Sequence, residues 1–395
     1  MATVGERNAV ISGIGQSQVG RRLGRSGLDL TLEAVAQALA DAGLTREDID
    51  GVSSWPGYSA EMPGFSPVSI NALRDSLKLE LNWYNAGNEA TQMSALINAC
   101  MAVACGQARH VLCFRTVLES SAAAQRAHAA HAAQGPAPRV SGYNEFLAPF
   151  DALSPANWVG LVASRYFHEF GASREQLGAI ALNARKNAML NPNAVYRDPL
   201  TMEQYLGSRM ISTPLCLYDC DVPVDGATVL IVSHRDAAKD LRSLPVQVES
   251  ICGPFKGHDS WDQMPDLTRY YAEEAGKRLW SRTDFKPKDV KLAELYDGFS
   301  MLTLLWLEAL GFCGRGEAAA FVEGGQRIAL DGELPLATHG GQLSAGRLHG
   351  MGYIHEAVVQ LRGEGGARQV PNGPQLAVAT NGGGPFAGAV LLSTH

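Results

Sequence analysis

The chain has few charged residues and no cluster of one sign. Charged residues make up 18% of its 395 residues, and the formal net charge is −7. No basic stripe of the kind that binds nucleic acid is visible, and no apolar run reaches the roughly 18 residues that span a bilayer. The N-terminus lacks a basic stretch followed by an apolar one, which a secretion signal would need. These absences predict a cytoplasmic protein with neither a nucleic-acid nor a membrane partner.

Metal-ligand spacing is also missing. The seven cysteines form no CxxC pair and no Cys/His ligand pattern, so reduced and mostly buried thiols are expected. His128 and His131 stand in an alanine-rich tract without a nearby cysteine or carboxylate, which is typical of a solvated helix face. We therefore expect no metal. By contrast, glycines are abundant and gather near the C-terminus, where the backbone must approach something closely.

Strand-like and helix-like segments alternate along the chain. Apolar residues at helical spacing predict a helix over 28–42 that ends at Gly43. A nearly all-apolar stretch over 89–106 predicts a helix buried on every side. Such alternation predicts a parallel sheet covered on both faces. The other expected helices span 174–187, 264–281, 300–310 and 346–363, and the expected strands lie at 8–15, 50–54, 110–115, 225–233, 246–252 and 291–296, with a final pair around 381–384.

The same pattern divides the chain into two halves. Residues 117–218 interrupt the alternation and look like an inserted loop domain that covers the sheet edge. We expect an N-terminal half at 1–244, which contains this insertion, and a C-terminal half at 245–395. Each half carries a strand, a sharp turn, a buried helix and a strand, which suggests an internal duplication.

Four segments far apart in the sequence carry the functional signal: 85–92, 294–299, 340–350 and 380–384. In order and spacing they resemble the four active-site loops of the thiolase superfamily, over nearly the whole chain. They are most similar to the lipid-transfer-protein branch, which includes steroid side-chain aldolases that pair with a small zinc-ribbon/OB-fold protein. The resemblance implies an α/β thiolase fold: two similar βαβαβαββ halves in a five-layer αβαβα arrangement with an inserted loop domain.

The first loop departs from the thiolase pattern. Thiolases place their acyl-accepting cysteine at the start of the buried helix, where helix N-terminal amides favour a thiolate. Counting back from Gly106, that position falls on Glu89. A carboxylate does not replace a thiolate in thioester exchange, so ping-pong acyl transfer is not expected. Glu89 is either a general base or a charge that only stabilises the helix N-terminus.

The second and third loops supply the candidate acid–base residues. Tyr296 stands where thiolases carry Asn or His, and the aldolase branch has a tyrosine there that is implicated in proton transfer. Alternatively, it is a core tyrosine with a bonded hydroxyl. His349 and Gly350 fit the Tyr-x-His-Gly of that branch, while Arg347 replaces its tyrosine and is a candidate for stabilising an enolate oxygen. Tyr353 and His355 are weaker candidates, explained equally well by a buried helix face.

The fourth loop replaces the second thiolase cysteine. Thr380 stands in the cysteine place of Cys-x-Gly-Gly-Gly, followed by Asn381 and three glycines. The resemblance implies that amides at Gly383 and Gly384 form an oxyanion hole. A threonine hydroxyl of ordinary pKa is a poor substitute base.

Loss of both cysteines with retention of these loops favours chemistry that needs an enolate but no acyl-enzyme. Retro-aldol cleavage of a β-hydroxyacyl-CoA is the first reading, with coenzyme A as part of the substrate and no other cofactor. A non-catalytic acyl-CoA or lipid-binding subunit is the second. A thioester hydrolase or acyltransferase is the third, a hydrolase using Glu89 as a base toward water. The resemblance further implies a homodimer and a small zinc-ribbon/OB-fold partner.

Overall fold

The computed structural model describes residues 5–60, 64–87, 91, 93–124, 140, 142, 144–239, 241–256 and 260–394. Glu89, His128 and His131 lie outside the described residues, so the expectations for their positions are not tested by the fold. Within the described ranges, no helix is both long enough and apolar enough to cross a membrane.

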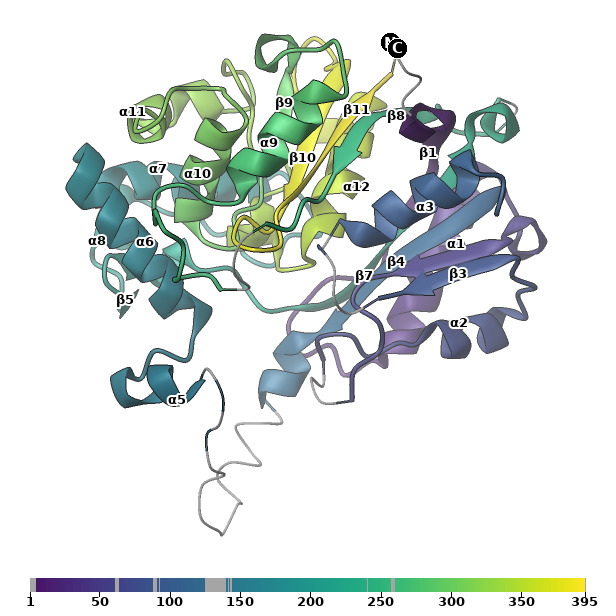
Figure 1. The fold of residues 1–395 in the computed structure, drawn as a ribbon, viewed down its shortest axis with the longest axis horizontal. Helices are drawn as coiled ribbons and strands as arrows, with labels where there is room; N and C mark the ends of the chain where they lie inside the picture. Colours follow the sequence, from purple (N-terminus) through teal and green to yellow (C-terminus); the bar gives the residue numbers. More distant parts are fainter. Residues whose placement is uncertain are drawn as a thin grey trace.

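One large mixed sheet forms the centre of the described part of the chain (Figure 1). The strands from the N-terminal part of the chain form one side of the sheet, in the order β3-β2-β4-β7-β1. The strands from the C-terminal part continue it in the order β8-β11-β10-β9. The two groups join where Val10 and Ile11 pair with Gln247 and Val246. The strands are β1 (Ala9–Gln16), β2 (Gly51–Ser54), β3 (Trp83–Ala86), β4 (His110–Leu118), β7 (Asp225–His234), β8 (Val246–Cys252), β9 (Leu292–Glu294), β10 (Leu376–Asn381) and β11 (Gly388–Ser393).

Helices cover the sheet in layers. In the N-terminal half α1 packs against β1 and β7, while α3 packs against β4, β2 and β7. In the C-terminal half α9 packs against β11 and β8, and α12 contacts β10 and β9 as well as β7 and β1 of the other half. The helices are α1 (Gly27–Ala42), α2 (Ile70–Leu77), α3 (Ser94–Ala104), α5 (Asn144–Leu147), α6 (Pro155–Phe170), α7 (Arg174–Ala188), α8 (Met202–Leu206), α9 (Ala272–Ser281), α10 (Ser300–Ala309), α11 (Ala318–Val322) and α12 (Gly350–Leu361).

Helix α1 shows how local sequence sets this packing. Ser26 caps its N-terminus by accepting a 3.1 Å hydrogen bond from the Asp29 N–H, and Gly43 ends it with φ 72°. Strand β1 presents Gly13 and Gly15 to the helix, and a Cβ at either position would overlap the α1 backbone. The glycines thus allow helix and sheet to approach closely, and the predicted helix over 28–42 is confirmed.

The sheet direction corrects one expectation. Strands β2, β3 and β4 are parallel, as are β9 and β10, but the β4–β7, β7–β1, β1–β8, β8–β11 and β10–β11 pairs are antiparallel. A fully parallel sheet was the wrong prediction. Alternation of strands and helices does not report strand direction, because a connection that contains helices can also return the chain antiparallel, as it does between β4 and β7.

Three helices begin later than predicted. Helix α9 starts at Ala272 rather than at 264, since Asp266 accepts the Thr268 N–H at 2.9 Å in a local turn that competes with helix. Helix α12 starts at Gly350 because Gly346 has φ 124° and ψ 150°. Helix α3 starts at Ser94, with Met93 as its N-cap.

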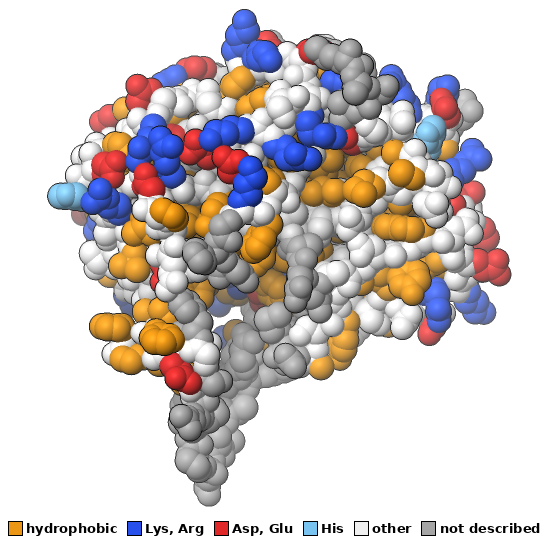
Figure 2. Space-filling model, viewed as in Figure 1, with side chains coloured by type: hydrophobic (Ala, Val, Ile, Leu, Met, Phe, Trp, Pro, Cys, Tyr) orange, Lys and Arg blue, Asp and Glu red, His pale blue; other side chains and the backbone are white. Residues whose placement is uncertain are grey.

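The insertion is largely helical. It contains α5 to α8 and a two-stranded sheet of β5 (Met210–Ser212) and β6 (Leu215–Cys216). Strand β4 continues to Leu118, so the first residues predicted for the insertion belong to the main sheet. Helix α5 stands away from the body (Figure 1), and Figure 2 shows apolar side chains over it; Phe146 and Phe150 are exposed. The division into halves at residue 245 stays a prediction.

Candidate active site

The four predicted loops meet at the ends of strands from both halves. The sulfur of Met93, the residue before α3, lies 3.9 Å from the side-chain nitrogen of Asn381. The Thr91 hydroxyl donates a 3.2 Å hydrogen bond to the carbonyl of Phe386, just beyond the glycine-rich loop. A Cβ at Gly350 would overlap the Asn381 side chain. The described residues of the first, third and fourth loops are therefore in contact.

Tyr296 follows β9 and is buried. Its backbone N–H donates a 2.8 Å hydrogen bond to Oγ1 of Thr380, which fixes the second loop against the end of β10. Its ring packs over Gly298, where a Cβ would lie 2.7 Å from Cε1 of Tyr296. The ring centre lies 6.0 Å from that of Tyr353. Glycine at position 298 thus leaves room for the candidate base.

His349 caps the N-terminus of α12 with an unusual backbone, φ 55° and ψ −165°. A non-glycine residue held at positive φ is strained, and such strain often marks a functional position. The centre of its ring lies 5.1 Å from that of Phe65, in an edge-on contact. Its Nε2 lies 3.5 Å from a carboxylate oxygen of Glu119. Burial and the nearby charge of Arg115 lower the pKa of His349 to about 4, so the ring is neutral at pH 7.

Arg347 binds two carboxylates. Its Nε lies 2.7 Å from Glu119 and its Nη1 lies 2.9 Å from Asp221. Burial raises the pKa of Asp221 to about 6, against the opposing effect of Arg347. Burial alone would also raise the pKa of Glu119, but His349, Arg347 and Arg115 outweigh it and hold that pKa at about 2. Two of the donor atoms of Arg347 are therefore already engaged by protein groups.

The hydroxyl of Tyr353 connects to the second loop through Asp297. Its hydroxyl donates a short hydrogen bond to Asp297 and accepts one of 3.1 Å from the Asp297 N–H. Asp297 also accepts the Gln342 N–H at 2.7 Å, which ties the second loop to the third. Burial raises the pKa of Tyr353 well above its usual range, so this phenol is not a base near neutrality.

The glycine-rich loop after β10 has the backbone that an oxyanion nest needs. Gly382 and Gly383 have φ of 64° and 147°. The indole N–H of Trp306 in α10 donates a 2.9 Å hydrogen bond to the Gly382 carbonyl, and a Cβ at Gly384 would lie 2.7 Å from the Trp261 ring. Packing on these two tryptophans holds the loop in place.

Sequence reasoning missed the residues at the end of β4. Arg115 is buried and Glu119 is partly buried beside the site, and Arg115 lies 4.5 Å over the Phe65 ring. The Arg115 guanidinium also interacts electrostatically with Tyr296, the candidate base. The place of Arg115 and Glu119 in the sequence could have indicated them. They stand at the end of β4, which runs parallel to β2 and ends at the same edge of the sheet as β2 and β3.

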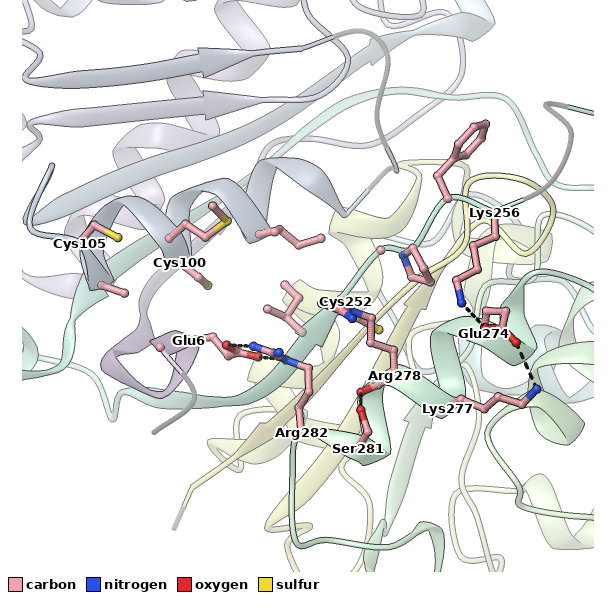
Figure 3. A pocket seen from close by; sticks show the side chains of 18 residues that line it. Glu6, Cys100, Cys105, Cys252, Lys256, Glu274, Lys277, Arg278, Ser281 and Arg282 are labelled. Carbon is pink, nitrogen blue, oxygen red and sulfur yellow. Dashed lines mark hydrogen bonds and ion pairs between the residues drawn. The ribbon is translucent and has the colours of Figure 1, made fainter. Parts of the chain in front are cut away.

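A wide surface groove lies elsewhere. It has a volume of about 870 Å³ and runs between α3 and α9, beside the end of β8 (Figure 3). Glu6 and Arg282 form an ion pair of 2.6 Å in it, and Lys256 bonds Glu274 at 2.8 Å. Neither Tyr296 nor His349 lines it, so this groove is separate from the four loops.

Comparison with known proteins places the chain. Residues 253–393 match the family described as thiolase C-terminal domain-like. The chain is 36% identical to a steroid side-chain-cleaving aldolase of Thermomonospora curvata, with 97% of each protein covered. It is also 36% identical to a 17-hydroxy-3-oxo-4-pregnene-20-carboxyl-CoA lyase of Mycobacterium tuberculosis, covering 97% of this chain and 98% of that protein.

Solved structures agree with the sequence relatives. The structure of an Ltp2-ChsH2(DUF35) aldolase superposes with a TM-score of 0.86 at 33% identity and 98% coverage of both chains. Human mitochondrial 3-ketoacyl-CoA thiolase superposes with a TM-score of 0.67 at 15% identity, covering 99% of each chain, which shows the shared fold alone. The predicted thiolase fold is confirmed. The chain belongs to the thiolase superfamily, in the branch that contains the steroid side-chain-cleaving aldolases.

Proposed function

We propose that this protein is a lyase that cleaves the Cα–Cβ bond of a β-hydroxyacyl-CoA by a retro-aldol reaction. The observation that carries the proposal is the contact between the Tyr296 loop and Thr380 at 2.8 Å. This backbone contact fixes the loop that carries the Tyr296 phenol beside the position where thiolases keep a cysteine. The steroid substrates named for the relatives favour a bulky side-chain CoA thioester as the substrate class.

Tyr296 is the base in this proposal. It accepts the proton of the β-hydroxyl group while the Cα–Cβ bond breaks, so that the β-carbon leaves as a ketone or aldehyde. Arg115 and Arg347 both attract the phenolate form of Tyr296. In a buried site, two nearby guanidinium groups stabilise an anionic base that water would otherwise have to solvate.

The electron pair of the broken bond passes into the thioester as an enolate. Neutral His349 and the amides of Gly383 and Gly384 are the hydrogen-bond donors proposed for its oxygen, and Asn381 orients the loop. One such donor is typically worth about 3 kcal/mol, roughly a hundredfold in rate. Arg347 is paired with Glu119 and Asp221, which balance its charge, so it is not one of the proposed donors to the enolate. The enolate then takes a proton at Cα and leaves as a shortened acyl-CoA.

A cysteine nucleophile has no support at this site. Burial raises the pKa of Cys252 to about 12 and that of Cys113 well above its usual range, so both stay protonated and inert. The reaction proposed here needs no acyl-enzyme and no cofactor beyond the coenzyme A of the substrate. Glu89 keeps its two proposed roles, a general base or a charge at the start of the buried helix.

Carbonyl release tests the proposal. The protein would be incubated with a panel of β-hydroxyacyl-CoA thioesters, including tertiary alcohols on a bulky ring, and free ketone or aldehyde would be measured. We expect release with at least one bulky substrate. If no member of the panel yields a carbonyl product while acyl-CoA still binds tightly, the protein is a binding subunit instead. The assay is run with and without a zinc-ribbon/OB-fold partner protein.

We also propose a homodimer that pairs through the N-terminal half. Strand β3 is the last in the sheet order, and an unpaired edge strand invites pairing with another chain. Tyr84 on β3 is 69% exposed and Met101 on α3 is 59% exposed, and Figure 2 shows apolar side chains over this side. Light scattering at micromolar concentration should give twice the mass of the chain. A monomeric mass contradicts the dimer.

A further inference from the structure

A small polar cavity reaches the candidate active site from the protein surface. Its volume is about 40 Å³, and His349 forms part of its wall. Gln342 and His339, from the segment before α12, line it as well. The exposed Asn193 and the partly exposed Arg368 also line it, so it extends toward solvent.

The cavity wall carries polar atoms that no described residue satisfies. Both polar side-chain atoms of Gln342 and Nδ1 of His349 lack a hydrogen-bond partner among the described residues, although both side chains are buried, and Nε2 of His349 lies 3.5 Å from Glu119. A buried polar group left without a partner destabilises the folded state. A space of about 10–15 Å³ is enough for one water, which needs two to four polar partners. The cavity meets both requirements.

Acidic groups around the cavity raise the pKa of the His339 ring in its wall. His339 is buried and lies 3.2 Å from Glu294. Burial alone would lower the pKa of His339, but Glu294, then Glu356 and Asp297, raise it above its usual range. The Thr338 hydroxyl bridges Glu294 at 2.6 Å and Glu356 at 2.8 Å.

Two further titratable residues, Arg368 and His355, line the cavity. Arg368 bonds both oxygens of Glu356 at 2.9 Å, which balances that carboxylate. His355 lines the cavity too, and burial lowers its pKa to about 4. Of the three imidazoles in the cavity wall, His339 thus has a raised pKa, and His349 and His355 have lowered ones.

We propose that this cavity holds water that joins the His349 ring to the Gln342 amide and the His339 ring, and that this chain carries protons to the acyl-CoA site. The proposal rests on the proposed function, since it takes His349 as part of that site. The β-hydroxyl proton goes to Tyr296. The neutral His349 ring gives the proton on one nitrogen to the enolate Cα while its other nitrogen takes a proton from the water, so the ring does not become an anion. The water regains its proton from His339, which recovers one from solvent, and Tyr296 releases its proton to solvent before the next turnover.

Gln342→Met tests the relay with the least damage to the fold. Removing His339 would leave the buried Glu294 without the imidazole that pairs with it and would destabilise the fold. Met is close to Gln in length but holds no water. Leu343→Met is the matched control, because it introduces the same side chain in the same turn and Leu343 does not line the cavity.

The readout is exchange of the α-protons of propionyl-CoA in D₂O, followed by NMR. Exchange needs enolate formation and a route for solvent protons, but no Cα–Cβ cleavage. The wild type and Leu343→Met should exchange at similar rates, and Gln342→Met should be slower by about tenfold or more, on the scale of losing an acid–base group. Its affinity for propionyl-CoA should be unchanged. Equal exchange in Gln342→Met overturns the relay and leaves the proposed cleavage standing.

A crystal structure at high resolution gives a second measurement that is independent of activity. We expect an ordered water within hydrogen-bond distance of the Gln342 side chain and the His349 ring. A cavity without such a water overturns the relay. If the water is present but the wild type neither exchanges α-protons nor cleaves any β-hydroxyacyl-CoA, the relay and the proposed function both fall.

Discussion

The backbone N–H of Tyr296 and the hydroxyl oxygen of Thr380 form a buried hydrogen bond of 2.8 Å between β9 and β10. Parallel pairing of these strands brings their ends together, and the hydroxyl fixes how the second loop leaves the sheet. Thr380 occupies the place of a thiolase cysteine, yet here its oxygen holds the candidate base in position. This contact makes the role of Thr380 structural and testable.

Thr380→Val should destabilise the protein because it keeps the shape of the side chain but leaves the Tyr296 N–H buried and unpaired. The expected loss in free energy of unfolding is about 1–3 kcal/mol. Thr380→Ser retains the acceptor and should lose less. Urea denaturation followed by circular dichroism measures both. Equal stabilities of the Val and Ser variants would show that the hydrogen bond contributes nothing.

Tyr296→Phe should lower kcat by roughly a hundredfold or more, the usual scale for losing an acid–base group. Affinity for acyl-CoA should change little, because the phenol acts mainly in the transition state. Tyr84→Phe on the exposed edge strand β3 is the control and should keep full activity. Steady-state kinetics of carbonyl release gives kcat and KM for each. A Tyr296→Phe variant with normal kcat would remove the phenol from the mechanism.

Gly350→Ala should disrupt the site, since its Cβ would overlap the Asn381 side chain. We expect loss of most of the activity together with lower stability. Gly352, one half-turn further along α12, has only ordinary contacts around an added Cβ, the nearest at 3.5 Å. Gly352→Ala should therefore stabilise the protein by about 0.5–1 kcal/mol, as expected in a helix interior. Thermal unfolding distinguishes the two, and equal effects would contradict the close contact of Gly350 with Asn381.

The titration of His349 should appear in the pH dependence of stability. Its pKa is about 4 in the folded protein, lowered mainly by burial, against about 6.5 in the unfolded chain. The folded state thus favours the neutral ring, so its contribution is fully present above pH 6.5 and is lost as the pH falls toward 4. The size is on the order of 3 kcal/mol.

His349→Asn should abolish that part of the pH dependence. Denaturant unfolding between pH 4 and pH 7 would be compared for the wild type and the variant. The wild type should lose more stability over this window than the variant does. Parallel curves for the two proteins would show that His349 does not titrate as a buried neutral ring.

Much of the fold could be predicted from the sequence because local signals were strong. The cap at Ser26, the αL residue Gly43 and the apolar face of α1 give a helix whose bounds follow from short-range chemistry. Strand direction could not be predicted in this way. Whether β7 runs antiparallel to β4 depends on how a hundred intervening residues fold, and no local pattern near Asp225 reports it.

The site was predicted in part for the same reason. Tyr296, His349 and Thr380 stand in loops with recognisable glycine spacing, and the structure brings these loops together. Arg115, Glu119 and Asp221 have no motif around them. Their importance comes from burial and from charges that approach across long sequence separations, such as the Arg347–Asp221 pair of 2.9 Å.

Product analysis tests the central claim most directly. The protein is incubated with a bulky β-hydroxyacyl-CoA in the absence of free coenzyme A. The products are then separated, identified and quantified by mass spectrometry. Retro-aldol cleavage should give equal amounts of a ketone or aldehyde and a shortened acyl-CoA, with no free coenzyme A consumed or released. Release of free coenzyme A with the intact hydroxy acid, or recovery of unchanged substrate bound to the protein, would contradict it.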